Sequence, residues 1–290
     1  MMKGKVTIVT GANAGMGRQI SLQLAQSGAT VVMVCRNPQR GQIALADVRS
    51  QSGSDTVDLL LADMSSQQSV RALAQEFESK YDRLDVLVNN VGVTLPRRTE
   101  TVDGIETVFA TNHLGPFLLT NLLLPVLQAS APSRIITVSS GAQAMARLNL
   151  DDPQSRNGYS GIRVYNQTKL LNLLFTYELA RRLQGTGVTA NAVEPGFVKT
   201  NMKVPFPFSL FSFMRSSVEK GAWASVHAAT SPALDGVSGE FFNHRGKAIR
   251  SSKASYDQGA GGRLWQLSAE LTHLPADTEL NQGVGTLRKG

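Results

Sequence analysis

The 290-residue chain is 42% hydrophobic and 18% charged, with 26 glycines and 11 prolines, and this composition excludes disordered and collagen-like proteins. One cysteine cannot close an internal disulfide, and with four scattered histidines it cannot form a Cys/His zinc cluster, so we expect no metal and a reducing environment. The net charge of +7 admits nucleic acid or an anionic membrane as a partner, but scattered basic residues fit a polyphosphate cofactor equally well, and we expect no nucleic-acid partner.

Short apolar segments rich in β-branched residues recur along the chain and are predicted to be strands. They span residues 5–10, 30–35, 57–61, 85–89, 134–139, 188–193 and 240–243. Most are apolar at nearly every position, which is typical of strands buried on both faces of a parallel sheet. No segment has the pattern of a signal peptide or the length of a membrane span, so a soluble, cytoplasmic protein is expected.

Helix-length segments with spaced apolar residues lie between these strands. They span residues 15–27, 38–51, 65–81, 102–128, 160–183 and 218–230. The alternation predicts an α/β fold, a single doubly wound Rossmann-type domain with a mostly parallel seven-stranded sheet and helices on both faces. We assign residues 1–245 to this domain, and residues 246–290 to a looser C-terminal extension that packs on it or trails from it.

Local signals support three of the helix boundaries. Ser65 and Ser66 are candidates for an N-cap, and Gly28 stands where a glycine commonly ends a helix. Pro116 should kink or divide the helix predicted over 102–128, close to Asn112.

A glycine-rich loop follows the first predicted strand and opens the first predicted helix. Its candidate ligands for a dinucleotide are Gly11, Asn13, Ala14, Gly15, Met16 and Gly17. Glycines let a pyrophosphate approach the backbone, and the helix N-terminus offers free N–H groups and a partial positive charge. The alternative is an ordinary tight turn, but the order of strand, loop and helix favours cofactor binding.

These motifs resemble the classical short-chain dehydrogenase/reductase family. The matching positions are residues 10–17, 89–92, Asn112, Ser139, Ser140, 165–169, Pro195, Gly196 and Thr200. Residues 103–106, 112–119, 131–134, 183–189 and 264–271 are similar to its retinol-dehydrogenase-like branch. The chain departs from the family at Val91, where alanine is usual, and from the branch at Pro116, where histidine is common.

Tyr165 and Lys169 are four residues apart in a helical pattern, so both side chains should emerge on one face. The ammonium would stabilise the phenolate and lower the pKa of the tyrosine, and it could also bind the ribose hydroxyls of the cofactor. The alternative is an exposed aromatic residue and a solvated lysine. The resemblance implies that Tyr165 is the catalytic acid/base, that Ser140 donates to the substrate oxygen, and that Asn112 holds a water joined to Lys169.

The resemblance also supplies most of the cofactor contacts. It implies contacts from Asn90, Val91 and Gly92 after the fourth strand, and from Asp63 and Met64 at the adenine. It further implies that Pro195, Gly196, Val198 and Thr200 hold the nicotinamide carboxamide.

The end of the second predicted strand bears on the choice between NAD(H) and NADP(H). NAD enzymes place an acidic residue there, but this chain has Cys35 followed by Arg36. The Arg36 guanidinium suits a 2′-phosphate, with Asn37, Arg40 or Asn13 as second ligands, so NADP(H) is favoured. In the alternative, Arg36 stacks on the adenine of NAD.

Two further segments should shape the substrate site. The 25 positions from Ser140 to Tyr165 exceed the spacing in many family members, and the added residues 149–152 and 156–161 should form the rim of the pocket. Residues 204–214 contain four phenylalanines and admit three interpretations: a substrate-binding loop, a peripheral membrane contact or an oligomer contact.

The predicted function is therefore oxidoreduction between NADP(H) and a lipophilic alcohol and its aldehyde or ketone, such as a retinoid or steroid. The rival hypothesis is an NADP(H)-binding redox sensor or scaffold without turnover, and the light-dependent pigment reductases share parts of the motifs. Family habit implies a homodimer or homotetramer formed through the helices of residues 102–128 and 160–183.

Overall fold

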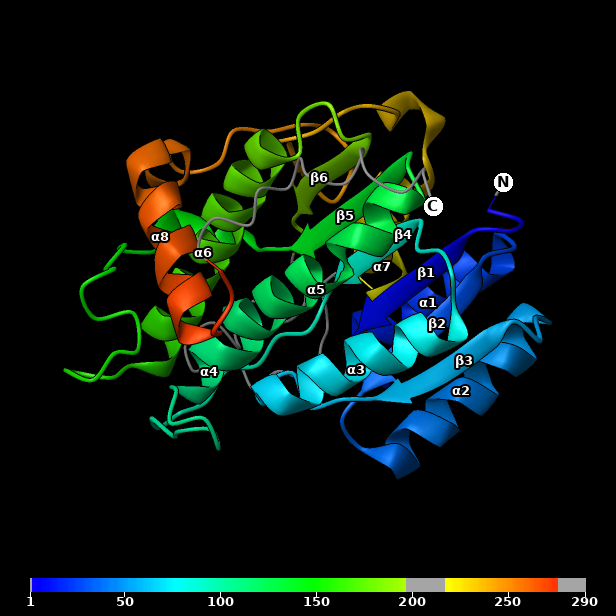
Figure 1. The fold of residues 1–290 in the computed structure, drawn as a ribbon, viewed down its shortest axis with the longest axis horizontal. Coiled ribbons are helices and arrows are strands. Elements are labelled where there is room, and N and C mark those ends of the chain that lie inside the picture. Colours follow the sequence, from blue (N-terminus) through cyan, green and yellow to red (C-terminus); the bar gives the residue numbers. More distant parts are fainter. Residues whose placement is uncertain (1, 197–216, 276–290) are drawn as a thin grey trace, which may run out of the picture.

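A seven-stranded parallel sheet with the strand order β3-β2-β1-β4-β5-β6-β7 forms the centre of the molecule (Figure 1). The computed structural model describes residues 2–196 and 217–275. Every pair of neighbouring strands is parallel, and the chain reverses its direction of winding between β1 and β4. The predicted doubly wound architecture is confirmed.

The strands agree with their predicted positions to within two residues at each end. They are β1 (Val6–Thr10), β2 (Thr30–Cys35), β3 (Val57–Leu61), β4 (Val86–Asn89), β5 (Ser133–Val138), β6 (Val188–Val193) and β7 (Phe241–Phe242). The side chains of β1 and β6 are buried throughout, as expected for strands covered on both faces.

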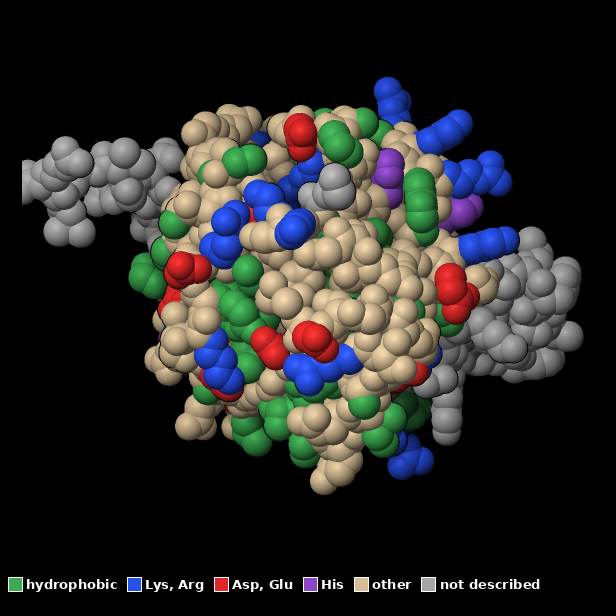
Figure 2. All heavy atoms as spheres, turned by 90° about the vertical axis from the view of Figure 1, so that its right-hand side faces the viewer, with side chains coloured by type: hydrophobic (Ala, Val, Ile, Leu, Met, Phe, Trp, Pro, Cys, Tyr) green, Lys and Arg blue, Asp and Glu red, His purple; other side chains and the backbone are tan. Residues whose placement is uncertain are grey.

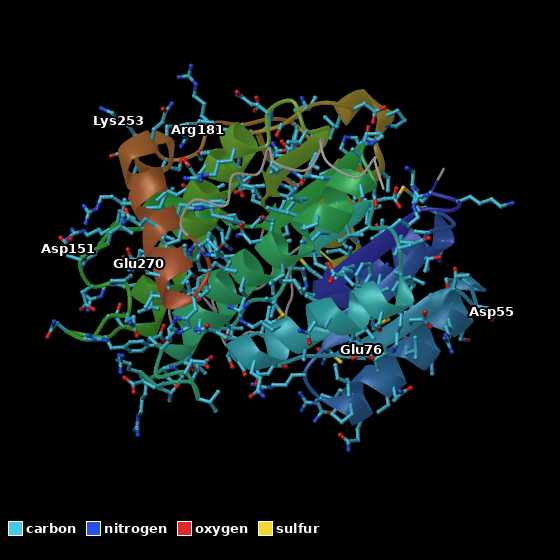
Figure 3. All side chains as sticks on the ribbon, in the orientation of Figure 1. Asp55, Glu76, Asp151, Arg181, Lys253 and Glu270 are labelled. Carbon is cyan, nitrogen blue, oxygen red and sulfur yellow. The ribbon has the colours of Figure 1, made fainter. Side chains whose placement is uncertain are left out.

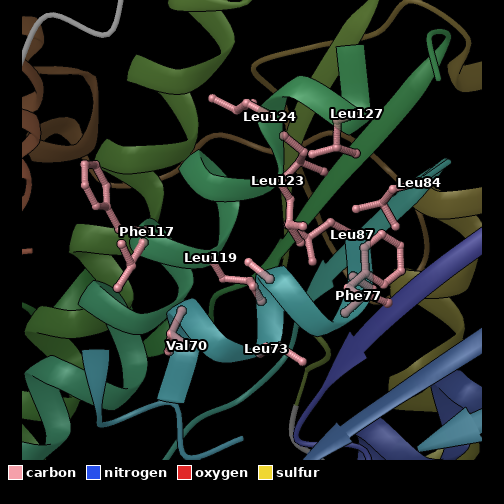
Figure 4. Packing of buried hydrophobic residues seen from close by; sticks show 14 of the residues in the cluster. Val70, Leu73, Phe77, Leu84, Leu87, Phe117, Leu119, Leu123, Leu124 and Leu127 are labelled. Atoms are coloured by element: carbon pink, nitrogen blue, oxygen red, sulfur yellow. The ribbon is translucent and has the colours of Figure 1, made fainter. Parts of the chain in front are cut away.

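Helices cover both faces of the sheet. They are α1 (Gly15–Gln26), α2 (Pro38–Ser52), α3 (Gln67–Lys80), α4 (Thr107–Phe109), α5 (Gly115–Ala129), α6 (Gly161–Arg182), α7 (Val218–Thr230) and α8 (Gln258–Leu271). One core packs α1, α2 and α7 against the sheet, and the other packs α3, α5 and α6 against its opposite face. Figure 4 shows this second core, where Leu73 and Phe77 of α3 meet Leu119 and Leu123 of α5.

The segment predicted as one helix over 102–128 is divided close to Asn112, as expected. A π-helical turn over Ala110–Leu114 separates α4 from α5. Pro116 lies directly after this turn, in helical backbone that continues from it, and has no N–H to donate to a carbonyl of the preceding turn. Residues before 107 are not helical, because the Glu106 carboxylate caps α4 by accepting from the backbone N–H groups of Val108 and Phe109 at 2.9 and 2.7 Å.

Two capping predictions are confirmed. The Ser66 hydroxyl accepts a hydrogen bond from the backbone N–H of Ser69 at the start of α3. Gly28 follows the last residue of α1 by two positions and has a φ of 90°, a conformation that favours glycine.

Helix α8 lies in the C-terminal extension that was expected to pack on the domain or to trail from it, and over residues 258–271 the extension packs on the domain as a helix that was not predicted. Trp265 is buried with its ring centroid 5.0 Å from that of Phe117 on α5 and 6.0 Å from that of Phe175 on α6. Three glycines in the first five residues make α8 a weak helix on its own, so its stability comes from this packing. No helix in residues 2–196 and 217–275 has the length and apolar character needed to cross a membrane.

Acidic and basic side chains are interspersed over much of the face shown in Figure 2. At one side of this face, Lys, Arg and His side chains gather around exposed hydrophobic surface. The exposed residues Lys220, His244, Arg245 and Lys247 and the half-exposed Trp223 come from α7 and the turn after β7. The turn packs on the helix there, since a Cβ on Gly246 would lie 2.8 Å from the His227 ring.

The His113 ring joins the π-helical turn to α8, because its Nε2 lies 2.9 Å from the Ser268 hydroxyl. Burial lowers the pKa of His113 to about 4, against a smaller opposing effect from the neighbouring Asn172. In the unfolded chain the imidazole takes up its proton near pH 6.5. The folded state is therefore fully stabilised above that pH and loses stability as the pH falls towards 4.

We expect the free energy of unfolding to fall by roughly 3 kcal/mol between pH 6.5 and pH 4 through this one group. His113→Gln should flatten the pH dependence by that amount in urea unfolding, while His244→Gln, which changes an exposed histidine, should leave it unaltered. If the free energy of unfolding of His113→Gln depended on pH as steeply as that of the unmodified protein, the role of His113 in this pH dependence would be contradicted.

Candidate active site

A cleft of about 910 Å³ runs along the carboxyl ends of β1, β2 and β4. The structure brings the predicted cofactor residues of four separate segments together in its walls. They are Gly11, Asn13, Ala14, Gly15, Met16, Gly17, Arg36, Asp63, Met64, Asn90, Val91 and Gly92. Ligands bind at this position, where the winding reverses, in open α/β sheets.

The glycine-rich loop fits a nucleotide phosphate. A Cβ on Gly17 would lie 2.2 Å from the Gly11 carbonyl oxygen, so only glycine allows the first turn of α1 to pack this closely on the loop. Gly15 has a φ of 52° and faces open space, and the N-cap residue Ala14 has no side chain that could bond to the N–H groups of the first turn. These N–H groups therefore remain available to an anion.

Asn90 braces the loop from the neighbouring strand. Its Nδ2 donates to the Thr10 carbonyl oxygen at 2.8 Å, and its backbone N–H donates to the Thr10 hydroxyl at 3.0 Å. These two bonds tie the loop after β1 to the end of β4.

The adenosine end of the cleft carries Arg36 and Asp63. Arg36 Nη1 lies 3.4 Å from Asp63 Oδ2, and the arginine side chain is 74% exposed. Burial raises the pKa of Asp63, but hydrogen bonds from Ser65 and the Arg36 charge outweigh it and hold this pKa below its usual value. Cys35, the last residue of β2, directs its thiol to the Asn37 carbonyl oxygen.

The proposed second ligands of a 2′-phosphate differ in their availability. Asn37 Oδ1 caps α2 by accepting from the Arg40 backbone N–H at 2.9 Å, and Asn37 is not among the residues that line the cleft. Asn13 and Arg40 both line the cleft and remain candidates.

The four predicted catalytic residues converge beyond Gly92. Tyr165 and Lys169 share one face of α6, and the Tyr165 hydroxyl is hydrogen-bonded to the side chain of Ser140, which follows β5. Lys169 Nζ lies 5.5 Å from the centroid of the Tyr165 ring. A Cβ on Gly92 would stand 3.5 Å from this Nζ and 3.9 Å from Asn112 Oδ1, so the lysine and the asparagine flank the glycine.

Asn112 lies in the π-helical turn, a kind of irregularity that is frequent at functional sites. Its Oδ1 accepts from the Val93 backbone N–H at 2.7 Å, and its Nδ2 donates to the Val93 carbonyl oxygen at 2.9 Å and the Thr168 hydroxyl at 3.1 Å. These bonds occupy the side chain, so a water, as predicted at this position, would have to bind the backbone of Asn112.

The predicted lowering of the Tyr165 pKa by Lys169 is wrong for this structure. Burial raises the pKa of Tyr165, and the hydrogen bond with Ser140 only partly offsets this effect. Lys169 Nζ instead donates to the Val138 carbonyl oxygen at 2.9 Å, and burial lowers the pKa of this lysine to about 8. The ammonium therefore faces the strand end and the tyrosine ring rather than the phenolic oxygen.

Three groups that hold the catalytic residues were not predicted. The backbones of Val93 and Val138 bond to Asn112 and Lys169, and the Thr168 hydroxyl donates to the Tyr165 carbonyl oxygen at 2.8 Å. Backbone groups leave no signal in a sequence. Thr168 was recognisable only as a position between the tyrosine and the lysine.

Of the predicted rim residues 149–152 and 156–161, the structure places Ser160 and Gly161 in the lining of the cleft. Ser160 and Ile162 line the cleft opposite Leu95 and Pro96. The Tyr159 hydroxyl donates to the Leu95 carbonyl oxygen at 3.0 Å, which fixes one wall to the other. Figure 3 shows Asp151, from the same segment, beside α8, where it pairs with Arg263 at 3.0 Å.

Pro195 and Gly196 follow β6 at the same edge of the sheet, where Gly196 packs on the His244 ring. Val198, Thr200 and the phenylalanine-rich segment 204–214 lie outside the residues that the structure describes.

Comparison with known proteins agrees with this geometry. The family model for short chain dehydrogenases matches residues 5–207. This chain belongs to the short-chain dehydrogenase family. Such enzymes are oxidoreductases that use a nicotinamide cofactor and a small-molecule substrate, and the residues of this cleft fit that cofactor.

The similar curated proteins include several retinol dehydrogenases. Retinol dehydrogenase 12 of Mus musculus is 40% identical over 273 residues, which cover 92% of this chain and 86% of that protein. Retinol dehydrogenase 11 of Homo sapiens is 39% identical over 281 residues, which cover 95% of this chain and 88% of that protein. The similarity to the retinol-dehydrogenase-like branch is confirmed.

Solved structures share the fold. The crystal structure of an uncharacterized protein from Mycobacterium paratuberculosis has a TM-score of 0.79 and 34% identity, covering 94% of this chain and 95% of that one. RhlG of Pseudomonas aeruginosa, solved with NADP, has a TM-score of 0.69 and 25% identity, and the match covers 90% of this chain and 97% of that one.

The buried Lys169 predicts how the rate depends on pH. Its ammonium loses the proton as the pH rises through about 8, and a neutral amine could not replenish the proton that Tyr165 would donate in carbonyl reduction. We expect kcat/KM for reduction to be flat between pH 6 and 7 and to fall above about pH 8, measured as initial rates of cofactor oxidation. A plateau that extends to pH 10 would contradict this assignment.

Proposed function

We propose that the protein is an NADP(H)-dependent oxidoreductase that interconverts a lipophilic alcohol and its aldehyde or ketone. The observation that carries the proposal is the convergence of Ser140, Tyr165, Lys169 and Asn112 beside Gly92, where the glycine-rich cleft continues towards α6. A scaffold that only bound the cofactor would not require this complete set.

The residues of the chain divide the proton chemistry between them. A bound nicotinamide supplies or accepts the hydride at the substrate carbon. In reduction, the hydroxyls of Ser140 and Tyr165 bind the carbonyl oxygen of the substrate and stabilise the negative charge that develops on it. Tyr165 then donates its phenolic proton to this oxygen. Lys169 replenishes this proton through a water held by Asn112.

The choice of NADP(H) rests on the adenosine end of the cleft. The exposed Arg36 guanidinium follows β2 directly, and Cys35 offers no carboxylate to a ribose hydroxyl. Binding of the 2′-phosphate would replace the 3.4 Å pair with Asp63 and release this carboxylate for the adenine. RhlG, at 25% identity, was solved with NADP, which supports the same choice.

An apolar substrate fits the outer part of the cleft. Beyond Gly92 its walls include Val93, Leu95, Pro96 and Ile162. The relatives named retinol dehydrogenases support a lipophilic alcohol of this kind, and a retinoid, a steroid or a similar apolar carbonyl compound is the proposed substrate class.

We also propose a cytoplasmic protein whose helices α5 and α6 do not form an oligomer contact. Helix α8 fills the groove between them and buries Trp265 against Phe117 and Phe175. A homodimer or homotetramer would have to use another surface. The single free cysteine, Cys35, is compatible with a reducing environment.

Tyr165→Phe tests the catalytic assignment. Removing the hydroxyl eliminates the proton donor and leaves the cofactor cleft intact, so we expect kcat to fall at least about 10³-fold, with the Kd for NADPH within about twofold of the original. Steady-state rates with apolar aldehydes and fluorescence titration of NADPH give the two values. Near-normal turnover would refute the assignment.

Arg36→Asp tests the cofactor preference. The substitution replaces the proposed phosphate ligand with a carboxylate that repels a phosphate and can accept from a ribose hydroxyl. We expect the ratio of kcat/KM with NADPH to that with NADH to fall at least about 100-fold. Arg245→Asp, a charge reversal outside the cleft, is the control, and an equal ratio in the two variants would count against the role of Arg36.

A further inference from the structure

Glu194 places a carboxylate beside the catalytic serine. It directly follows β6, whose residue Val193 accepts a hydrogen bond from the Ser139 backbone N–H at 2.8 Å. Glu194 Oε2 lies 3.1 Å from the position that a Cβ on Gly141 would occupy. Gly141 is the residue next to Ser140, so the acidic group lies at the serine end of the catalytic cluster.

The alternation of side chains along β6 determines the face on which Glu194 lies. Val193 packs in the core covered by α1, α2 and α7, whereas Ala192 packs against Leu173 of α6 on the opposite face. Successive side chains of a strand point to opposite faces, so Glu194 shares the face of Ala192. Helix α6 covers this face and also carries Tyr165 and Lys169.

The carboxylate lacks a strong partner within residues 2–196 and 217–275. No hydrogen bond or ion pair to it is recorded there, although the side chain is only partly exposed. Burial raises the pKa of Glu194, and among the described residues the opposing charge comes from His244, which packs on Gly196. A partly buried carboxylate without a close cation strongly disfavours a second anion nearby and favours a hydrogen-bond donor.

We propose that Glu194 is a specificity-determining residue that excludes substrates carrying a carboxylate near the reacting carbon. It favours uncharged alcohols and carbonyl compounds, and among them those with a second hydroxyl group that can donate to Glu194. The inference deepens the proposed function and rests on it, since it assigns a role to the acidic group at the serine end of the catalytic cluster.

Matched aldehydes test this role. We would compare benzaldehydes that carry either a carboxylate or a hydroxymethyl group at the same ring position, 3 or 4, with NADPH as the cofactor. The unmodified protein should prefer the hydroxymethyl compound at least tenfold in kcat/KM, and Glu194→Gln should reduce this preference about tenfold. Glu240→Gln changes an exposed acid just before β7 and should leave the preference unaltered.

The proposal would be overturned if Glu194→Gln still reduced the hydroxymethyl compound and its preference for that compound stayed within twofold of the preference of the unmodified protein. Failure of every aldehyde to react with the unmodified protein would instead refute the proposed function. The role of Glu194 is then decided by a binding measurement that needs no turnover.

In that measurement, benzoate and benzyl alcohol are titrated by ligand-observed NMR into the protein saturated with NADP⁺. Benzoate should bind Glu194→Gln at least tenfold more tightly than the unmodified protein, and benzyl alcohol should bind both equally or the variant more weakly. Equal benzoate affinities, or no benzoate binding to the variant, would overturn the proposal. A cooperative thermal unfolding transition in each variant serves as the control that the variant is folded.

Discussion

A buried ammonium is the constraint on which the site depends. Lys169 lies in the interior with the Val138 carbonyl oxygen 2.9 Å from its Nζ, so the end of β5 and the middle of α6 are tied together by a charged group that has lost its water. Such a group is costly to bury, which its lowered pKa reflects. The fold accepts this cost where the catalytic residues converge, with Nζ 5.5 Å from the centroid of the Tyr165 ring.

The rest of the site follows from the direction of the strands. Because all strands are parallel, the residues after β1, β2, β4, β5 and β6 reach one edge of the sheet, and segments far apart in the chain meet there. Helix α6 then approaches this edge with Tyr165 and Lys169 one turn apart. The π-helical turn adds Asn112 from the other side, with its side chain fixed by Val93 and Thr168.

The sequence predicted the sheet and most helices, because buried parallel strands are continuous apolar runs and the helices between them are amphipathic. It also identified the cofactor loop, since glycines at fixed spacing reflect a steric demand like that at Gly17. Helix α8 was missed because its own sequence is glycine-rich, and only contacts such as those of Trp265 with α5 and α6 make it stable.

The electrostatics of the site were predicted less well. The spacing of Tyr165 and Lys169 indicates that they share a face, but not that Nζ turns to a backbone carbonyl or that burial dominates the pKa values of both. Glu194 gave no signal because an acid at the end of a strand is ordinary, and only the neighbouring Gly141 shows that it lies beside the serine. Such effects depend on distances that spacing along the chain does not fix.

Helix α8 also bears on the order in which the chain matures. It contacts the π-helical turn through Ser268, the wall segment through Arg263, and α3, since Arg71 and Gln67 donate to the carbonyl oxygens of Thr272 and Leu271. These contacts form only after the last part of the domain has left the ribosome. Until then Phe117 and Phe175 lack their cover of Trp265, and transiently exposed apolar surface of this kind makes an incomplete chain prone to aggregation.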